Sequence, residues 1–212
     1  MSIEDAHAIH QQRVTALHTT LAQVPLDSPA LTLEIGCGHG HFLTAYAAAH
    51  PGEHCLAIDI IKERLEKAAR KTDRAELTNV SWIRAAAEDL VEALPAGVRF
   101  NRNIFVLFPD PWPKRRHWKN RLIQPAFLDT LAQLSAASTR LCFRTDHAPY
   151  FASARDTVDA HPRWRLTPEE SWPFEQTTVF EQKAASFQSF IARPIENTET
   201  PAEIETKSAT SN

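Results

Sequence analysis

Short apolar runs alternate with amphipathic or charged segments along most of this chain. Such an alternation of strand-like and helix-like segments is typical of a parallel sheet with helices on both faces. It predicts an α/β fold with a doubly wound, mostly parallel sheet. The expected strands are residues 31–35, 54–58, 80–84, 103–108, 141–144, 164–166 and 187–192, and the expected helices between them are residues 41–50, 62–71, 88–94 and 125–134.

The two ends of the chain differ from this alternating pattern. Residues 1–24 have the spacing of one amphipathic helix, which the following prolines and turn formers end. Residues 196–212 consist mostly of Glu, Thr, Ser, Ala and Asn and have almost nothing to bury, so we expect a disordered tail. We therefore predict one domain over residues 1–195, with the first helix as part of it.

The composition of the chain limits its partners. The formal net charge is -3 and the pI is near 6.4, which argues against nonspecific coating of nucleic acid, so a nucleic-acid contact would need a local basic patch. The 3 cysteines show no close pairing, which suits a reducing compartment. The start lacks the order of a signal peptide, and no apolar run approaches membrane-spanning length. We expect a cytoplasmic protein with no membrane contact.

Four of the expected strands carry a carboxylate at or near their carboxyl ends. These are Glu34, Asp59, Asp110 and Asp146. Because the carboxyl ends of parallel strands meet at one edge of a sheet, where ligands bind in open α/β folds, the four acids predict a polar ligand site.

A glycine loop follows the first expected strand. Gly36, Gly38 and Gly40 alternate where the backbone must turn tightly and a ligand can come close, although such a loop alone is equally compatible with a structural turn. The loop lacks the last glycine of the dinucleotide fingerprint, so it suits a ligand with an ammonium group better than a pyrophosphate. Asp59 lies 19 residues beyond Gly40, where an acid can accept both ribose hydroxyls. Together with Glu34, it resembles the S-adenosylmethionine site of class I methyltransferases.

The segment after the fourth strand combines prolines, aromatic rings and positive charge. Its prolines, at 109, 111 and 113, forbid a helix and predict a stiff extended loop that holds Asp110 and Trp112. An isolated basic run is most simply a solvated loop, but its attachment to this loop favours contact with phosphates and a base. The candidate phosphate clamp consists of Arg115, Arg116, Lys119 and Arg121, next to Lys114.

Three blocks of sequence resemble one known family. Residues 108–114 (FPDPWPK) and 121–125 (RLIQP) closely resemble the Pro-Asp-Pro-Trp block of the bacterial tRNA (guanine-N7-)-methyltransferases. Residues 144–150 (RTDHAPY) resemble the Thr-Asp segment of that family, and residues 178–181 (TVFE) resemble its Thr-x-(Tyr/Phe)-Glu segment. The blocks occur in the family's order, and the likeness extends from about residue 31 to residue 193.

The resemblance implies a class I methyltransferase with a Rossmann-like sheet of seven strands, one of the late strands being antiparallel. The cofactor would be S-adenosylmethionine, the partner would be tRNA, and the product would be N7-methylguanosine in the tRNA variable loop. Asp110 would be the active-site acid. At the matching positions, the cofactor contacts would be Glu34, Gly36, Gly38, Asp59 and Asp110, and the substrate contacts would be Lys114, Asp146, Thr178, Val179, Phe180 and Glu181.

The chemistry of guanine N7 suggests what these residues would do. This nitrogen carries an in-plane lone pair and no proton, so the reaction needs positioning, which can contribute about 7–11 kcal/mol, more than it needs a general base. We expect Asp110 to orient the guanine or the cofactor ammonium as an acceptor. Trp112 is the expected wall of the guanine pocket.

Some features leave alternatives open. Ala86 falls where the family has a third acidic or amide contact to the cofactor, and Glu88 or a backbone carbonyl could replace that contact. The loss permits a noncatalytic tRNA-binding relative, and a class I methyltransferase acting on a small molecule or protein is the other alternative. Residues 62–71 alternate in charge sign and predict a solvated helix face. Both a monomer and a homodimer are compatible with the sequence. We expect no metal site, because Cys37, His39 and His41 are too closely spaced for structural zinc.

Overall fold

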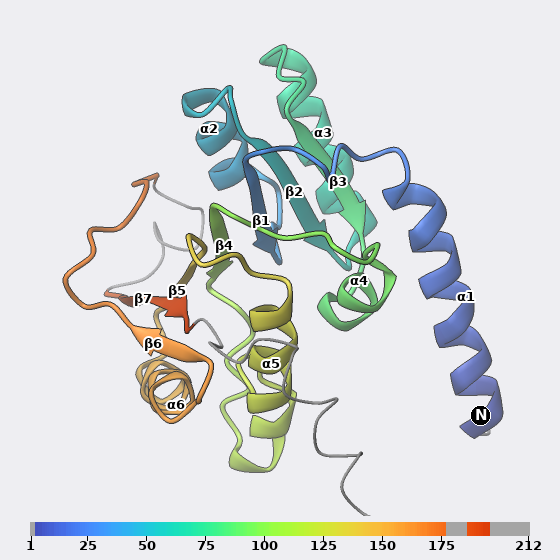
Figure 1. The fold of residues 1–212 in the computed structure, drawn as a ribbon. Helices are drawn as coiled ribbons and strands as arrows, with labels where there is room; N and C mark the ends of the chain where they lie inside the picture. The colour runs from blue at the N-terminus through green and yellow to red at the C-terminus, as the bar shows by residue number, and fades with distance from the viewer. Residues whose placement is uncertain (1–2, 177–185, 196–212) are drawn as a thin grey trace, which may run out of the picture.

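The protein is described by a computed structural model over residues 3–176 and 186–195. Seven strands form one sheet within these ranges, and helices cover both of its faces (Figure 1). The strands are β1 (Leu31–Ile35), β2 (His54–Asp59), β3 (Val80–Arg84), β4 (Asn103–Leu107), β5 (Arg140–Thr145), β6 (Trp164–Leu166) and β7 (Gln188–Pro194). The helices are α1 (Ile3–Leu21), α2 (His41–Ala49), α3 (Lys62–Arg74), α4 (Ala87–Ala93), α5 (Pro125–Gln133) and α6 (Ala148–Asp159), with the 3-10 helix η1 (Arg115–Asn120) between β4 and α5.

The strand order is β3-β2-β1-β4-β5-β7-β6. All neighbouring strands are parallel except at β7, which runs antiparallel to both β5 and β6. The sheet therefore confirms the predicted doubly wound, mostly parallel architecture with one antiparallel late strand. The order reverses between β1 and β4, which places a topological switch point, the usual ligand position in this fold, between those two strands.

Two helices are missing from the sequence prediction. Helix α6 begins after His147, whose ring accepts a hydrogen bond from the Tyr150 amide, and Pro149 lies in its first turn. These are helix-start signals that a strand-centred reading of the Thr-Asp segment overlooks. The second is the short 3-10 helix η1, whose 6 residues form about two tight turns within the basic segment.

The two faces of the sheet carry different cores, because successive residues of a strand point to opposite faces. In β1, Leu31, Leu33 and Ile35 belong to the larger apolar core, which includes residues of α1, α4, α5 and α6. Thr32 and Glu34 alternate with them and so face the layer formed by α2 and α3, whose core is separate and smaller. Both polar residues of β1 thus point into the same layer, at opposite ends of the strand.

Helix α1 packs along α4 at one side of the molecule (Figure 1). Val14, Leu17 and Leu21 are buried, as the predicted amphipathic face requires. Asp89 of α4, itself buried, pairs with His10 at 3.0 Å and with Arg13 at 3.1 Å. Apolar contacts and paired charges therefore hold α1 against α4. Among the described residues, no helix combines the length and apolar character that crossing a bilayer requires.

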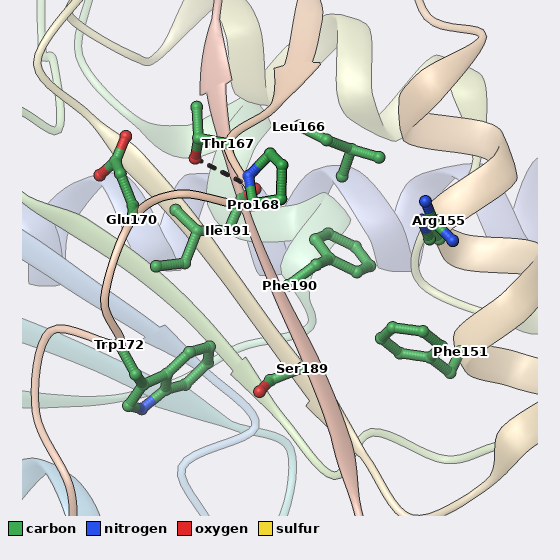
Figure 2. A pocket seen from close by; sticks show the side chains of 10 residues that line it. All are labelled: Phe151, Arg155, Leu166, Thr167, Pro168, Glu170, Trp172, Ser189, Phe190 and Ile191. Carbon is green, nitrogen blue, oxygen red and sulfur yellow. Dashed lines mark hydrogen bonds between the residues drawn. The ribbon is translucent and has the colours of Figure 1, made fainter.

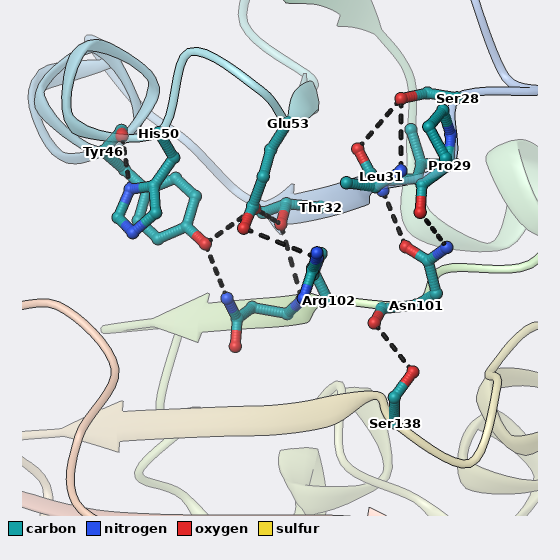
Figure 3. Close-up of polar contacts among 12 residues, drawn as sticks. Ser28, Pro29, Leu31, Thr32, Tyr46, His50, Glu53, Asn101, Arg102 and Ser138 are labelled. Carbon is teal, nitrogen blue, oxygen red and sulfur yellow. Dashed lines mark hydrogen bonds and ion pairs between the residues drawn. The ribbon is translucent and has the colours of Figure 1, made fainter.

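A polar cluster occupies the amino ends of β1, β2 and β4 (Figure 3). The Thr32 and Tyr46 hydroxyls each donate to Glu53 Oε2 at 2.8 Å, and Asn103 Nδ2 donates to the Tyr46 hydroxyl at 2.7 Å. Arg102 lies 3.7 Å from the other carboxylate oxygen of Glu53. Every one of these side chains has a partner, so the cluster ties α2 to three strands without needing a ligand.

Candidate active site

A cleft of about 580 Å³ opens at the carboxyl ends of β1, β2 and β4. Its lining combines the glycine loop, the turn after β2, the start of α4 and residues 107–110. Three of the four strand-end acids, Glu34, Asp59 and Asp110, share this cleft, as the sequence predicted from the strand ends. Asp146 is exposed directly after β5 and does not belong to the lining.

The glycine loop forms the wall between β1 and α2. The amides of Gly36 and Cys37 both donate to the Ile58 carbonyl, at 2.9 and 3.0 Å, which folds the loop over the end of β2. Gly40 has a φ of +69°, and a Cβ atom there would lie 2.5 Å from the Ala68 side chain and 2.6 Å from Trp82. Only glycine therefore fits where the loop meets α3 and β3.

Asp59 holds the glycine loop in place through backbone hydrogen bonds. Its Oδ2 accepts from the Gly38 amide at 2.9 Å, and its Oδ1 accepts from the Ile61 amide at 2.8 Å. Arg64, which also lines the cleft, lies 3.7 Å from Oδ2. Each carboxylate oxygen has a further lone pair, so Asp59 can still accept hydroxyl donors from a ligand.

Glu34 lies at the bottom of the cleft and is 3% exposed. Its Oε2 is buried and has no hydrogen-bond partner among the described residues. Burial, and then the negative charge of Asp59, raise the pKa of Glu34 from 4.5 to about 8. A cationic ligand group would stabilise the ionised carboxylate, which the protein alone does not.

The loop after β4 brings Asp110 to the cleft, where its side chain is exposed. The sequence predicted an extended loop, but the loop is bent at two residues. Phe108 and Trp112 have left-handed φ angles of 50° and 42°. Such angles are costly for aromatic residues and concentrate at functional sites. Trp112, the expected wall, does not line the cleft but packs edge-on against His117 at 5.8 Å between ring centroids, whereas Phe108 and Pro109 line the cleft.

Arg121 was wrongly included in the predicted phosphate clamp. Its side chain is only 3% exposed. The guanidinium donates to the Pro111 carbonyl at 2.9 Å and to the Ser153 hydroxyl at 2.7 Å, and lies over the rings of Trp118 and Tyr150. It therefore fastens the proline loop to α6 and is unavailable to a nucleic acid. Sequence patterns cannot separate this buried arginine from its exposed neighbours, because charge runs carry no information on burial.

The other cations of the basic segment are placed differently. Lys114, Arg115, Arg116 and Lys119 are all exposed. They form no ion pair with any other residue within residues 3–176 and 186–195, and Arg116 donates only to the ring of His117 next to it. This leaves four positive side chains beside the loop that carries Asp110.

The start of α4 forms the cleft wall at the position of Ala86. The Ala86 carbonyl accepts from the Leu90 amide at 3.0 Å as part of the helix. Glu88 lines the same cleft and is exposed. Of the two replacements that the sequence left open, the Glu88 carboxylate is therefore the more accessible acceptor.

Arg144 is a residue that the sequence reading did not single out. It is buried at the end of β5, lies between Trp172 and Phe187 at 4.2 and 4.5 Å, and pairs with Glu175 at 3.1 Å. Arg144 thus holds the chain segments on both sides of residues 177–185. The predicted substrate residues Thr178, Val179, Phe180 and Glu181 lie outside the described residues.

A second hollow, of about 340 Å³, lies between α6 and β7 (Figure 2). Phe151 and Arg155 enter it from α6, and Phe190 from β7. None of its lining residues is a predicted site residue, and it has no carboxylate with a raised pKa, so it is the weaker candidate. No metal-ligating cluster of His, Cys, Asp or Glu occurs in the part of the chain that the structure describes.

Comparisons with known proteins agree with this geometry. A family model described as "Putative methyltransferase" matches residues 28–193. The tRNA (guanine-N(7)-)-methyltransferase of Mycolicibacterium paratuberculosis is 34% identical over 182 residues, which cover 81% of this chain and 70% of that protein. The protein of the same name from Rhodospirillum rubrum is 39% identical over 143 residues, covering 68% of this chain and 54% of its own length, so this match spans about half of that relative.

Solved structures show the same fold. An rRNA methylase from Streptococcus thermophilus superimposes with a TM-score of 0.54, covering 85% of this chain and 95% of that one, at 15% sequence identity. The fold, the extent of the family match and the identity to the curated relatives lead to one assignment. This chain belongs to the bacterial tRNA (guanine-N7-)-methyltransferase family.

Proposed function

We propose that this chain transfers the methyl group of S-adenosylmethionine to N7 of a guanosine in the variable loop of tRNA. The observation that carries the proposal is one cleft that combines Glu34, Asp59 and Asp110, next to exposed cations on the same loop. The relatives in Mycolicibacterium paratuberculosis and Rhodospirillum rubrum bear the name of this reaction, which supports the same activity here.

The residues of the cleft fit the cofactor. The buried, unpartnered Oε2 of Glu34 would accept from the cofactor ammonium, and the free lone pairs of Asp59 would accept from the ribose hydroxyls. Gly36 and Gly38 let the backbone approach the ligand, and Glu88 would accept from the adenine amino group in place of the residue missing at Ala86. S-adenosylmethionine supplies an electrophilic methyl group on a sulfonium.

The protein's part in the reaction is positioning. Guanine N7 is already nucleophilic, so no side chain has to remove a proton from it. Asp110 would accept from the N1–H and amino edge of the guanine, which turns N7 toward the methyl group, while Phe108 and Pro109 wall the base. Lys114 and the exposed cations that follow it would bind backbone phosphates.

The remaining expectations stay part of the proposal. Asp146 and the block Thr178, Val179, Phe180 and Glu181 are proposed substrate contacts on the strength of the family resemblance. We also propose a cytoplasmic location, which the proposed tRNA substrate and the free, buried cysteines support. A single domain over residues 1–195 and a monomeric or homodimeric state are proposed as well, and the expected tail of residues 196–212 lies outside the described residues.

The direct test is mass spectrometry of nucleosides from tRNA incubated with the protein and S-adenosylmethionine. We expect N7-methylguanosine to appear, and to disappear when the transcript lacks the variable-loop guanosine. Methylation retained in that transcript would indicate another target. Failure to bind the cofactor in calorimetry at millimolar concentration would instead indicate a noncatalytic tRNA-binding protein.

The exposed cations have a test of their own. Replacing Arg115 and Arg116 with alanine should weaken tRNA binding and reduce its salt dependence by roughly one to two units of logarithmic slope. Affinity and slope equal to those of the unmodified protein would remove these residues from the interface. Stability should stay unchanged, because both side chains are exposed.

A further inference from the structure

A second group of positive side chains lies on α3, away from the basic segment. Lys67, Arg70, Lys71 and Arg74 are spaced by three, four and seven residues and so share one face of the helix. With His39 and His41, which flank the start of α2, they line a hollow of about 360 Å³. The expected helix over residues 62–71 showed alternating signs, but the observed helix continues to Arg74 and so adds a fourth cation to the face of Lys67 and Arg70.

The hollow contains no negative partner for these cations. All six lining side chains carry nitrogen groups and none is acidic. The acids of α3, which are Glu63, Glu66 and Asp73, do not line the hollow, and Glu66 pairs with Lys62 at 3.5 Å. Within the described ranges, these four cations, which we call the α3 stripe, form no ion pair. Lys67, Arg70 and Arg74 are exposed and can contact an external anion.

Contacts inside the hollow show a surplus of positive charge. The Lys71 ammonium donates to the His39 carbonyl and lies 3.0 Å from His41 Nε2. Burial, and then Lys67, lower the pKa of Lys71, while burial, and then the nearby lysines, lower the pKa of His39. A bound anion would relieve this repulsion.

The hollow adjoins the cofactor cleft. His39 and His41 belong to the lining of both. Cations therefore border the cleft at two places. The α3 stripe lies beside the glycine loop, and the basic segment lies beside the loop that carries Asp110. A small anion would need only one of these places, whereas a folded polyanion with a base inside the cleft can reach both.

We propose that the α3 stripe, with His39 and His41, is a phosphodiester-binding site that contacts the tRNA backbone as a second electrostatic anchor. The proposal rests on the proposed tRNA substrate. The anchor grips a part of the tRNA other than the part held by Lys114 and its neighbours. It contributes to tRNA affinity without touching the reacting atoms.

The experiment uses the full chain with Lys67→Glu and Arg70→Glu combined, and measures tRNA binding between about 50 and 200 mM salt. The matched control reverses two exposed arginines remote from the hollow, Arg99→Glu with Arg165→Glu, so that net charge changes equally. We expect the α3 variant to bind tRNA about tenfold or more weakly, with a salt slope smaller by roughly one to two, and the control to change far less. The KM for tRNA should rise while kcat at saturating tRNA and cofactor affinity stay the same.

The possible outcomes separate the two proposals. If the unmodified protein methylates tRNA and both double variants bind it equally, the α3 anchor is wrong and the proposed function stands. If the α3 variant loses binding of inorganic phosphate but keeps its tRNA affinity, the hollow is a free-anion site and the anchor is again wrong. If the unmodified protein neither binds nor methylates tRNA, both proposals fail. The milder pair Lys67→Gln and Arg70→Gln should shift tRNA binding in the same direction if the charge reversal impairs folding.

Discussion

The two ends of the central sheet both carry buried polar side chains, but they differ in whether these side chains have partners. At the amino end, the Thr32 and Tyr46 hydroxyls donate to Glu53 (Figure 3), and Asn103 donates to the Tyr46 hydroxyl. At the carboxyl end, Glu34 keeps a buried oxygen without a partner among the described residues. A missing partner for a buried polar group costs about 1–3 kcal/mol, and a ligand that donates a hydrogen bond to Glu34 would remove that cost. Trp118 and Arg121 also have a buried nitrogen without a partner among the described residues, so it is the open cleft over the unpartnered Glu34 carboxylate that distinguishes the carboxyl end.

A single strand supplies both situations. Thr32 and Glu34 are two residues apart in β1 and point to the same face of the sheet. What differs is the surrounding chain: α2 covers Thr32 with the Tyr46 side chain, whereas the glycine loop leaves a cleft over Glu34. The loop, more than the strand, therefore makes the site.

The largest effect should come from filling the one loop position that excludes a side chain. Gly40→Ala combines a left-handed φ with a Cβ clash against Ala68 and Trp82, so we expect a loss of about 3 kcal/mol in the free energy of unfolding and no detectable cofactor binding. Gly52→Ala is the control, because its Cβ would meet nothing within 4 Å. Equal stability of the two variants in chemical denaturation would show that the loop adapts.

Asp110→Asn should separate function from stability. The side chain is exposed in the cleft, so the melting temperature should stay within a degree or two of the original, while turnover falls about a hundredfold through loss of one orienting charge. Single-turnover methylation of tRNA measures the effect. Near-normal turnover would remove Asp110 from the mechanism.

Tyr46→Phe should produce the opposite separation at the amino end. It removes the hydroxyl that joins Asn103 to Glu53, leaving a buried amide short of a partner, so we expect a loss of about 1–2 kcal/mol in stability. Turnover measured well below the melting temperature should be unchanged. A variant that kept its stability but lost activity would reverse the roles assigned to the two ends.

The sequence predicted the sheet and the convergence of the strand-end acids. Both follow from the pattern of apolar residues and from the order of the strands along the chain. Apolar runs mark buried strands, and acids at the ends of parallel strands must converge, as Glu34, Asp59 and Asp110 do. Burial of individual charges does not follow from order. Arg121 and Arg116 are equivalent in a basic run, yet one is buried against Ser153 and the other is exposed.

The sequence analysis also missed elements that are marked by a helix cap or by local backbone angles and not by the spacing of apolar residues. Helix α6 depends on the His147 cap and Pro149, and the bend of the proline loop depends on left-handed angles at Phe108 and Trp112 that no residue type announces. The α3 stripe was hidden for a related reason. Residues three, four and seven apart share one face of a helix, and the face through Lys67 and Arg70 continues to Arg74, beyond the predicted helix end at residue 71.

The sharpest comparison comes from the same substitution, Glu to Gln, at the two ends of the sheet. Because the pKa of Glu34 is about 8 when folded and 4.5 in its ordinary state, the folded protein keeps a proton that the unfolded chain has lost across this range. Its contribution to stability therefore falls as pH rises from about 4.5 to 8, by up to about 1.4 kcal/mol per pH unit. Glu34→Gln should remove this slope, so the unliganded variant should be more stable than the original above pH 8. In the original, a cationic cofactor would favour the ionised carboxylate and release its proton, and the variant should release none. Glu53→Gln should have the opposite sign, a loss of up to about 1 kcal/mol at neutral pH, because Glu53 gives up a charge that Arg102 and two hydroxyls stabilise. Denaturation curves at pH 6 and pH 9 compare the two, and a loss of stability in both variants at pH 9 would show that Glu34, too, is satisfied within the protein.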